Sequence, residues 1–361
     1  MNQAHFPGGE RPLYRLLSST VNQYFQSTSL PRSGDIRLYR KALIIASLFV
    51  ASFAGILLSE GALNIGFWAL HGVATALVGF NIMHDGAHQS FSRSRRLNQL
   101  CAFTFNLIGS NRSYWSQKHN RNHHAFTNVD DVDEDIDALG LFRMSPHQKR
   151  YWFHRGQHIY VWLLYPLTSL FWFFVLDYKA YFRQKIGQKD FSHRLTVAEH
   201  AEFWASKVLY ILLYLVLPAS LPGEHNVLIG FLLMHAILGF LFAVVFQLAH
   251  VVDQAEFPQP AADGSMTSEW AEHQLRTTVD FATSSRVLTW ALGGLNFQVE
   301  HHLFPRVSHV HYPRLHALLS ETCRQQGLPI RSYPTLAQAL KAHYRHLRSM
   351  GQPQSEPAAR H

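Results

Sequence analysis

Long uncharged apolar runs divide this chain, and two of them lie close together near its start. Residues 42–58 and 63–83 contain no Asp, Glu, Lys or Arg, and only four residues separate them. A helix needs about 20 mainly apolar residues to cross a bilayer, and slightly shorter runs also suffice. The two runs therefore predict two membrane spans that form a helical hairpin.

Three more long apolar runs follow further along the chain. Residues 159–176 are uncharged and rich in aromatic side chains, and residues 203–221 are apolar except for Lys207. Residues 227–249 are apolar apart from His235 and Gln247. The short connection at 222–226 predicts that the last two runs form a second hairpin. Residues 97–108 are also apolar, but they are too few to span a bilayer.

Histidines recur at helical spacing beside these runs. His84 and His88 are four residues apart, as are His119 and His123, so each pair shares one face of a helix. His124 lies about 100° further round the helix, where it could reach a second metal ion.

Two further histidine positions belong with these pairs. Residues 298–302 read Gln-Val-Glu-His-His and form a third cluster, and His250 follows the apolar run at 227–249 directly. Neutral imidazole is a common ligand of iron, zinc and copper. Three clusters in a chain with 24 histidines therefore indicate a metal site.

The number of membrane crossings follows if all clusters serve one site. They then lie on one side of the bilayer, so an even number of crossings separates the second cluster from the third. Since 203–221 and 227–249 form a hairpin, residues 159–176 do not cross, and their tryptophans and tyrosine suit the interface. We expect an all-α integral membrane protein with four transmembrane helices in two hairpins and a cytoplasmic helical cap that holds the metal site.

Charge predicts which side of the membrane carries the site. The proposed outer turns, 59–62 and 222–226, contain no Lys or Arg, whereas the segments on the other side are rich in both. Positively charged loops remain in the cytoplasm, so the histidines are expected there. The same bias accounts for the formal charge of +8 and the pI near 9.5, and we expect no nucleic-acid partner.

An acidic run follows the second histidine cluster. Its members are Asp130, Asp131, Asp133, Glu134, Asp135 and Asp137. An EF-hand loop beginning at Asp131 would need Gly at its sixth position and Glu at its twelfth, and this chain has Ile136 and Phe142 there. Two interpretations stay open: a solvated loop, or carboxylates that orient metal-bound imidazoles. His71 and His235 lie inside spans without a partner histidine four residues away, and we interpret both as structural.

Together the clusters resemble the histidine boxes of the membrane fatty acid desaturases. The matching patterns are His-x-x-x-His, His-x-x-x-His-His and Gln-x-x-His-His, with two spans before the first and a hairpin between the second and third. Gln298 in place of a first histidine is similar to the front-end subgroup, which includes bacterial linoleoyl-CoA desaturase-like proteins. The resemblance implies O2-dependent desaturation of an acyl-CoA or acyl lipid. Front-end members insert a cis double bond between an existing one and the carboxyl end.

The resemblance also implies a di-iron centre with two irons per chain. Carried over by motif, its ligands are His84, His88, His119, His123, His124, His301 and His302, and His250 is added from its position at the end of a span. Further candidates as ligands or as supports of the ligands are Gln298, Asp85, Asp131, Asp133 and Asn296. Because most desaturases have a histidine at the position of Gln298, that coordination position is in doubt.

The resemblance further suggests the partners and the division of the chain. The sequence has no cysteine cluster, no Gly-x-Gly-x-x-Gly and no cytochrome b5 motif, so electrons are expected from a separate ferredoxin or cytochrome b5 type donor with its reductase. Residues 1–40 form an N-terminal cytoplasmic arm, 41–330 the desaturase domain, and 331–361 a C-terminal helix and disordered tail. We also expect helical surface over 268–285. The bacterial inner membrane is favoured over the endoplasmic reticulum.

Two alternatives remain open. A di-iron hydroxylase of lipids or hydrocarbons would share the same histidine boxes. A histidine-rich metal transporter would need ligands at mid-membrane depth along a path, whereas these clusters flank the spans.

Overall fold

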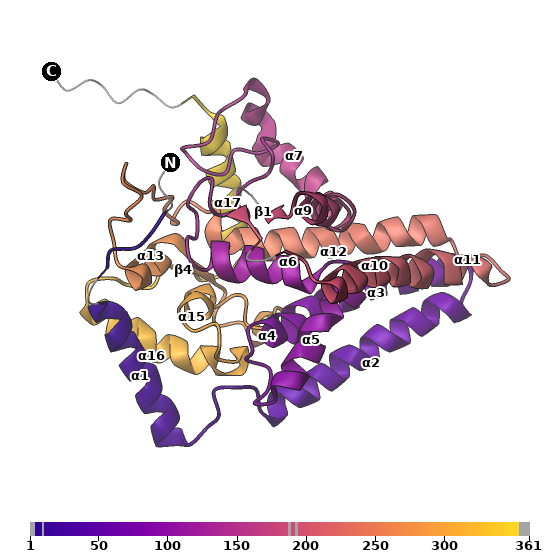
Figure 1. The fold of residues 1–361 in the computed structure, drawn as a ribbon, viewed down its shortest axis with the longest axis horizontal. Helices are drawn as coiled ribbons and strands as arrows, with labels where there is room; N and C mark the ends of the chain where they lie inside the picture. The colour runs from indigo at the N-terminus through magenta and orange to yellow at the C-terminus, as the bar shows by residue number, and fades with distance from the viewer. Residues whose placement is uncertain (1–3, 9–10, 187–188, 192–193, 354–361) are drawn as a thin grey trace.

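The computed structural model describes residues 4–8, 11–186, 189–191 and 194–353, and these residues are mostly helical (Figure 1). Within this part of the chain, five helical runs are long and apolar enough to cross a membrane. They are Ile36–Leu58, Gly61–Ala87, Trp152–Arg183, Val197–Ser220 and Val227–His250. Each long apolar run of the sequence thus lies in such a helix, which confirms the predicted helical membrane class.

Long helices packed side by side form the body of the molecule (Figure 1). Helix α2 (Ile36–Leu58) packs against α3 (Gly61–Val78), and α3 packs against α12 (Val227–His250). The run before α12 comprises α10 (Val197–Ile211), the π-helical turn η6 (Leu212–Val216) and α11 (Leu217–Ser220).

The two predicted hairpins have their turns in contact with each other. The N–H of Gly61 donates to the carbonyl of Glu224 at 3.1 Å, and the Asn226 amide donates to the Gly61 carbonyl at 3.2 Å. The turns therefore lie at the same end of the molecule, on the right in Figure 1.

The helices extend beyond the predicted runs at the end opposite these turns. Helix α2 begins at Ile36, where the Asp35 side chain accepts from the Arg37 N–H at 2.9 Å. Helix α3 continues through the π-helical turn η1 (Gly79–Met83) into α4 (His84–Ala87). Hydropathy marks the apolar part of a helix, whereas caps and charged turns set its ends, so the sequence predicted runs that were too short.

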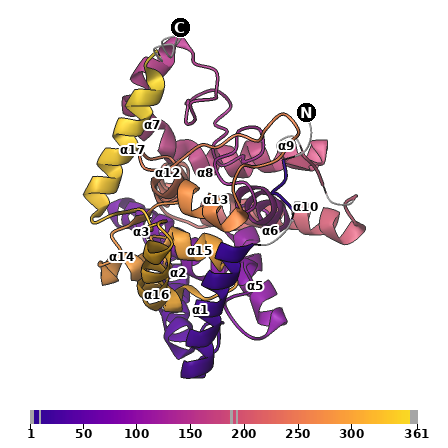
Figure 2. The same ribbon diagram turned by 90° about the vertical axis from the view of Figure 1, so that its left-hand side faces the viewer.

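The third apolar run lies across the other long helices. It comprises η3 (Trp152–Gly156), α7 (Gln157–Leu164), η4 (Tyr165–Leu167), α8 (Thr168–Phe171), η5 (Trp172–Leu176) and α9 (Asp177–Arg183). In Figure 2 it runs across the view, whereas α2, α3 and α12 point towards the reader. It packs closely on the middle of α12, since a Cβ at Gly239 would lie 2.7 Å from the Pro166 carbonyl oxygen.

Shorter helices gather at the end of the long helices away from the turns (Figure 1). They include α1 (Pro12–Thr28), α13 (Trp270–Thr277), α14 (Arg286–Ala291), α15 (Gln298–Leu303), α16 (Tyr312–Gln325) and α17 (Leu336–Gly351). Leu17 and Val21 of α1, four residues apart, share a core with Leu315 and Leu319 of α16. The amphipathic face of α1 therefore fastens the N-terminal arm to this region.

Short strands replace part of a predicted helix. Helical structure was expected over 268–285, but α13 ends at Thr277 and β3 (Asp280–Phe281) follows. Strand β3 pairs in parallel with β4 (Ser332–Tyr333), and β1 (Lys185–Ile186) pairs with β2 (Lys189–Asp190). Strands of two residues have no detectable hydrophobic period, so sequence reasoning could not find them. Most of the predicted disordered tail lies outside the described residues.

Candidate metal centre

Four separate elements deliver eight buried histidines to one region. His84 begins α4 and His88 follows it, while the π-helix η2 (Gln117–His123) carries His119 and His123. The others are His124 directly after η2, His250 at the end of α12, and His301 and His302 on α15. Each is no more than 6% exposed. Segments far apart in the sequence thus supply one interior site.

A glycine lets the first of these elements reach the centre. A Cβ at Gly86 would lie 2.6 Å from the Cβ of Cys101 and 2.7 Å from the Ala102 nitrogen, both on α5 (Arg95–Leu107). Only glycine permits this approach of α4 to α5 without a shift of backbone. The glycine between His84 and His88 therefore serves packing.

The rings form two groups of potential metal ligands. His84, His88, His119 and His301 form the first group, and His123, His250 and His302 form the second. Within each group the candidate ligand atoms lie within 4.8 Å of one another. In the second group the ring centroids are 4.6–4.8 Å apart. Two metal ions, one per group, are compatible with this arrangement.

The π-helical geometry of η2 brings His124 close to His119. The His124 N–H donates to the His119 carbonyl five residues back, at 2.9 Å, as in a π-helix. Consequently the Nε2 atoms of His119 and His124 lie only 3.1 Å apart, while the His119 and His123 rings stack with their centroids 5.2 Å apart. His119 and His123 also form a third possible ligand group with Asp135, and they thereby link the first two groups. The α-helical spacing assumed from the sequence did not anticipate the approach of His124 to His119.

His124 lies between the two groups. Its ring centroid is 4.6 Å from that of His301 and 4.3 Å from that of His302. These two neighbours belong to different groups, so His124 is placed to serve either one.

Several ring nitrogens are buried without a hydrogen-bond partner among the described residues. They are Nε2 of His84, His88, His301 and His302, and Nδ1 of His124. A buried polar atom left unpaired costs about 1–3 kcal/mol, so five of them in one place call for a common partner. A metal ion satisfies such lone pairs, and the site therefore fits metal by its chemistry as well as by its spacing.

Other side chains orient the rings from outside. Asp133 lies 3.0 Å from His123 Nδ1, and Gln274 lies 2.9 Å from His302 Nδ1. Holding Nδ1–H in this way leaves Nε2 free to bind metal. Asp133 is itself fixed, because it accepts from the Asn128 N–H at 2.8 Å. The acidic run therefore contains a carboxylate that contacts a histidine ring, as the second interpretation of this run requires.

Protonation of the rings follows from burial and charge. Burial lowers the pKa of His124, His301 and His302 well below the usual histidine value, and neighbouring rings add to the effect. These rings are therefore neutral, as metal ligands must be. Burial also acts on His123, but the Asp133 and Asp135 charges outweigh it and raise the pKa of that ring.

The remaining candidates from the sequence lie in different surroundings. Asp85 is buried and accepts from His309 Nδ1 at 3.0 Å and from the Ser308 hydroxyl at 2.8 Å. Asn296 is buried and donates to the Thr289 hydroxyl at 3.1 Å. Asp131 is exposed.

Gln298 is buried, and its side-chain amide donates to the Leu295 carbonyl at 2.9 Å.

Some contacts of the centre were not found by sequence reasoning. Asp135 lies 3.4 Å from His123 Nδ1, the Tyr312 hydroxyl lies 3.2 Å from His301 Nδ1, and Trp115 stacks on His119. The acidic run pointed to Asp135. Gln274 and Tyr312 carry no spacing signal, because they come from helices with no other residue in the site.

The two histidines inside the spans already have partners. His71 lies 2.8 Å from the Ser52 hydroxyl and 3.0 Å from the Tyr214 hydroxyl. Both nitrogens of His235 are matched in the same way, by hydroxyls on two other helical runs. This geometry fits the structural role expected for both.

An ionic cluster holds α15, the helix that carries the third histidine cluster, to its neighbours. His316 Nδ1 on α16 lies 3.1 Å from Asp280 and 3.0 Å from Glu300, and both carboxylates are fully buried. Burial opposes the charged ring, but hydrogen bonds to Asp280 and Glu300 outweigh it and raise the pKa of His316 to about 10. Asp280 also accepts from the Val299 N–H at 2.9 Å. The three residues could hold a cation by composition, but His316 already lies between the carboxylates.

Comparison with known proteins extends over most of the chain. The model of the fatty acid desaturase family matches residues 61–334. An acyl-lipid (8-3)-desaturase of Physcomitrium patens is 36% identical over 345 residues, which cover 94% of this chain and 71% of the relative. An sn-1 linoleoyl-lipid 6-desaturase of Synechocystis is 32% identical, with 95% of this chain and 96% of the relative covered. The chain therefore belongs to the fatty acid desaturase family, as its histidine boxes predicted.

Proposed function

We propose that this protein is a front-end desaturase of an unsaturated acyl chain. It removes two hydrogens from adjacent methylenes, with O2 as co-substrate, and inserts a cis double bond between an existing double bond and the carboxyl end. The observation that carries the proposal is the pair of buried histidine groups with unpaired ring nitrogens. The front-end position is supported by the relatives, since one is named a linoleoyl-lipid 6-desaturase and another a Delta(5) fatty acid desaturase.

The protein would bind two iron ions per chain. His84, His88, His119 and His301 would hold one ion, and His123, His250 and His302 the other. His124 would complete either group from its position between them. This assignment leaves Gln298, Asp85 and Asn296 as supports of the site and gives Asp131 no part in it.

Iron with O2 supplies the oxidising power for this reaction, because an unactivated methylene has no acidic proton for a general base to remove. The chain's own residues prepare the site. Asp133 and Gln274 fix two rings through Nδ1, and burial keeps His124, His301 and His302 neutral. Burial also keeps bulk water away from the reacting carbon.

Two electrons would come from a separate protein. The described chain has two cysteines, both buried and free, so no iron–sulfur cluster is available within it. A ferredoxin or a cytochrome b5 type protein with its reductase would supply them.

We further propose four membrane crossings with the histidines on the cytoplasmic side, in a bacterial inner membrane. The crossings would be α2, α3, the run from α10 to α11, and α12. The two turns, which contain no Lys or Arg, contact each other. This contact supports their common location on the outer side of the membrane. Trp152–Arg183 would lie along the interface, because it runs crosswise to the other long helices (Figure 2). The desaturase domain would comprise residues 41–330, between the N-terminal arm and the C-terminal helix.

Expression in a host that lacks polyunsaturated acids tests the function. Cells are fed a set of mono- and diunsaturated acids, and their fatty acid methyl esters are analysed by mass spectrometry for new double bonds. We expect a new bond on the carboxyl side of the existing one. A hydroxylated acid as the main product would contradict desaturation and favour the hydroxylase alternative. A new bond on the methyl side would contradict the front-end assignment alone.

A further inference from the structure

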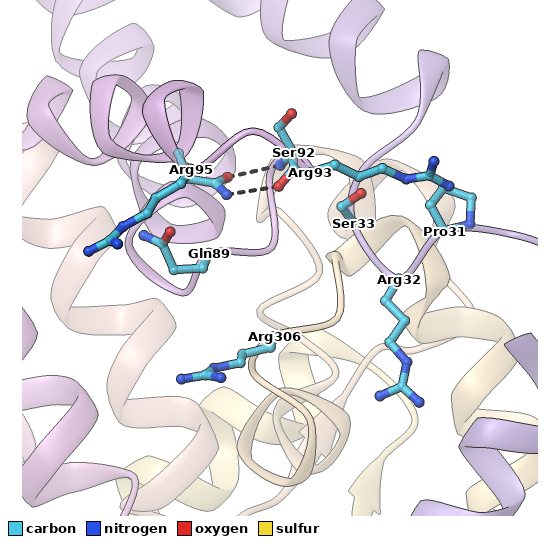
Figure 3. A pocket seen from close by; sticks show the side chains of 9 residues that line it. Pro31, Arg32, Ser33, Gln89, Ser92, Arg93, Arg95 and Arg306 are labelled. Atoms are coloured by element: carbon cyan, nitrogen blue, oxygen red, sulfur yellow. Dashed lines mark hydrogen bonds between the residues drawn. The ribbon is translucent and has the colours of Figure 1, made fainter.

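A pocket of about 490 Å³ opens where three segments far apart in the sequence meet (Figure 3). These segments are the connection between α1 and α2, the residues from the end of α4 into α5, and the residues after α15. Gln89 of this pocket directly follows His88, and Arg306 lies four residues after His302. Two of the three segments therefore continue along the chain from the first and the third histidine cluster.

The lining of the pocket is strongly basic. Arg32, Arg93, Arg95 and Arg306 belong to it, and none of its nine residues is acidic. Within the described part of the chain, the side chains of Arg93, Arg95 and Arg306 make no hydrogen bond or ion pair. Arg32 bonds only a neutral amide, that of Asn22. The positive charge of this pocket is thus uncompensated by the protein.

The wall that carries two of these arginines is held in place by hydrogen bonds. The Asn98 side chain accepts from the Ser92 N–H at 2.9 Å and donates to the Ser92 carbonyl at 2.8 Å, and both residues are buried. These bonds fix the chain between Ser92 and Asn98, and Arg93 and Arg95 project from this segment. Helix α5 also begins at Arg95, so its positive N-terminal end faces the same region.

A buried hydroxyl in the same lining lacks a partner. Ser33 is 9% exposed, lines the pocket, and its Oγ has no hydrogen bond among the described residues. A buried hydroxyl without a partner is costly, so its presence beside four arginines points to an acceptor that comes from a ligand. Arginine and hydroxyl donors together suit a phosphate group.

We propose that this pocket binds the phosphate group of the acyl carrier. The proposal rests on the front-end function, because a double bond inserted near the carboxyl end requires the carrier to lie close to the metal centre. Both a phospholipid head group and the coenzyme A of an acyl-CoA offer the phosphate. A concave site of this size suits a small ligand such as a phosphorylated head group, whereas docking of a protein needs a much wider surface.

A binding experiment on the purified full-length protein tests this directly. The pocket variant is Arg93→Gln/Arg306→Gln. The control variant, Arg286→Gln/Arg314→Gln, removes the same charge from exposed positions outside the pocket. Three probes are titrated in an uncharged detergent: a short-chain phosphatidylglycerol, coenzyme A, and a short-chain galactosyl glycerolipid. Thermal unfolding of all three proteins checks that the variants are folded.

We expect the pocket variant to bind a phosphate-bearing probe roughly a hundredfold more weakly, since two charge-assisted hydrogen bonds are lost and each is worth about tenfold. The control variant should bind it as the wild type does, and the galactolipid should not discriminate between the proteins. Selective loss for phosphatidylglycerol identifies a lipid carrier, and selective loss for coenzyme A identifies acyl-CoA. Equal affinities in the folded pocket variant and the wild type would overturn the proposal.

Two further measurements distinguish this proposal from docking of an electron donor and from failure of the front-end function. If the pocket variant binds both phosphate probes normally but is reduced more slowly by a ferredoxin, the basic pocket is a donor-docking surface and the proposal is wrong. If affinity is lost as expected but the wild type makes no front-end product, the pocket stands and the front-end function fails.

Discussion

At the scale of single residues, two aspartates of one acidic run differ in what they touch. Asp133 is buried against His123, whereas Asp131, two positions earlier, is exposed. We predict that Asp133→Asn weakens metal retention roughly 10–100-fold, because an amide no longer fixes the His123 tautomer as a carboxylate does. Iron content after a graded chelator challenge, measured by elemental analysis, checks this. Asp131→Asn is the matched control, and equal iron loss in both variants would contradict the assigned role of Asp133.

Gln298 provides a second residue-scale prediction. Its amide donates to the Leu295 carbonyl three residues back, so the side chain already has a local partner that is not a metal. Gln298→His should therefore leave the iron content unchanged while it alters activity or the position of the new bond. His302→Ala is the reference for true ligand loss, and it should abolish turnover and lower the iron content. If Gln298→His loses iron as His302→Ala does, Gln298 supports the metal directly.

Residue-level prediction from the sequence worked for the rings and less well for their supports. Imidazoles at helical spacing can be recognised in the sequence, because a metal site needs several of them close together. The side chains that accept hydrogen bonds from these rings follow no regular spacing in the sequence. Gln274 comes from α13 and Tyr312 from α16, and only the folded chain brings them to His302 and His301.

At the scale of elements, the ionic cluster behind α15 gives a stability prediction. His316→Gln should destabilise the protein by about 3 kcal/mol, because it leaves two buried carboxylates without their cation. Arg324→Gln on the same helix is the control, since its ion pair with Glu321 is fully exposed and contributes little to stability. Thermal unfolding in detergent measures both.

The same cluster predicts a dependence on pH. The pKa of His316 is raised from 6.5 to about 10 in the folded chain. Its stabilisation is therefore complete below the unfolded value and is lost as the pH rises through about 10. The difference in melting temperature between wild type and His316→Gln should be large at neutral pH and shrink above pH 10. A difference that grows in alkali would contradict the charged state assigned to His316.

Helices could be predicted where a regular hydrophobic pattern extends over enough residues. The apolar runs and the amphipathic α1 and α16 have such patterns, and the structure has helices at each. Two kinds of element lacked one. The strands β3 and β4 contain two residues each, and the π-helix η2 looks like an α-helix in sequence, although its wider turn brings His124 as well as His123 next to His119.

At the scale of the whole molecule, the proposed crossings can be tested by cysteine labelling. The two native cysteines are buried, so a membrane-impermeant thiol reagent reports introduced ones. Applied from the periplasmic side, it should label Glu60→Cys and Glu224→Cys and spare Gln99→Cys and Ser284→Cys. Arg155→Cys and Arg183→Cys, at the two ends of the crosswise run, should both be spared. Labelling of one of these two would show that Trp152–Arg183 crosses the membrane, which would contradict four crossings.

The division of the histidines among distant elements also sets when the centre can form. Each group contains a ring from α15, which the ribosome adds only after α2, α3 and α12 have been made. Earlier in synthesis the nascent chain holds an incomplete set of ligands in both groups. Complete binding of either proposed ion would therefore come late in the biogenesis of this protein, and a chain truncated before α15 would enter the membrane without a complete site for either ion.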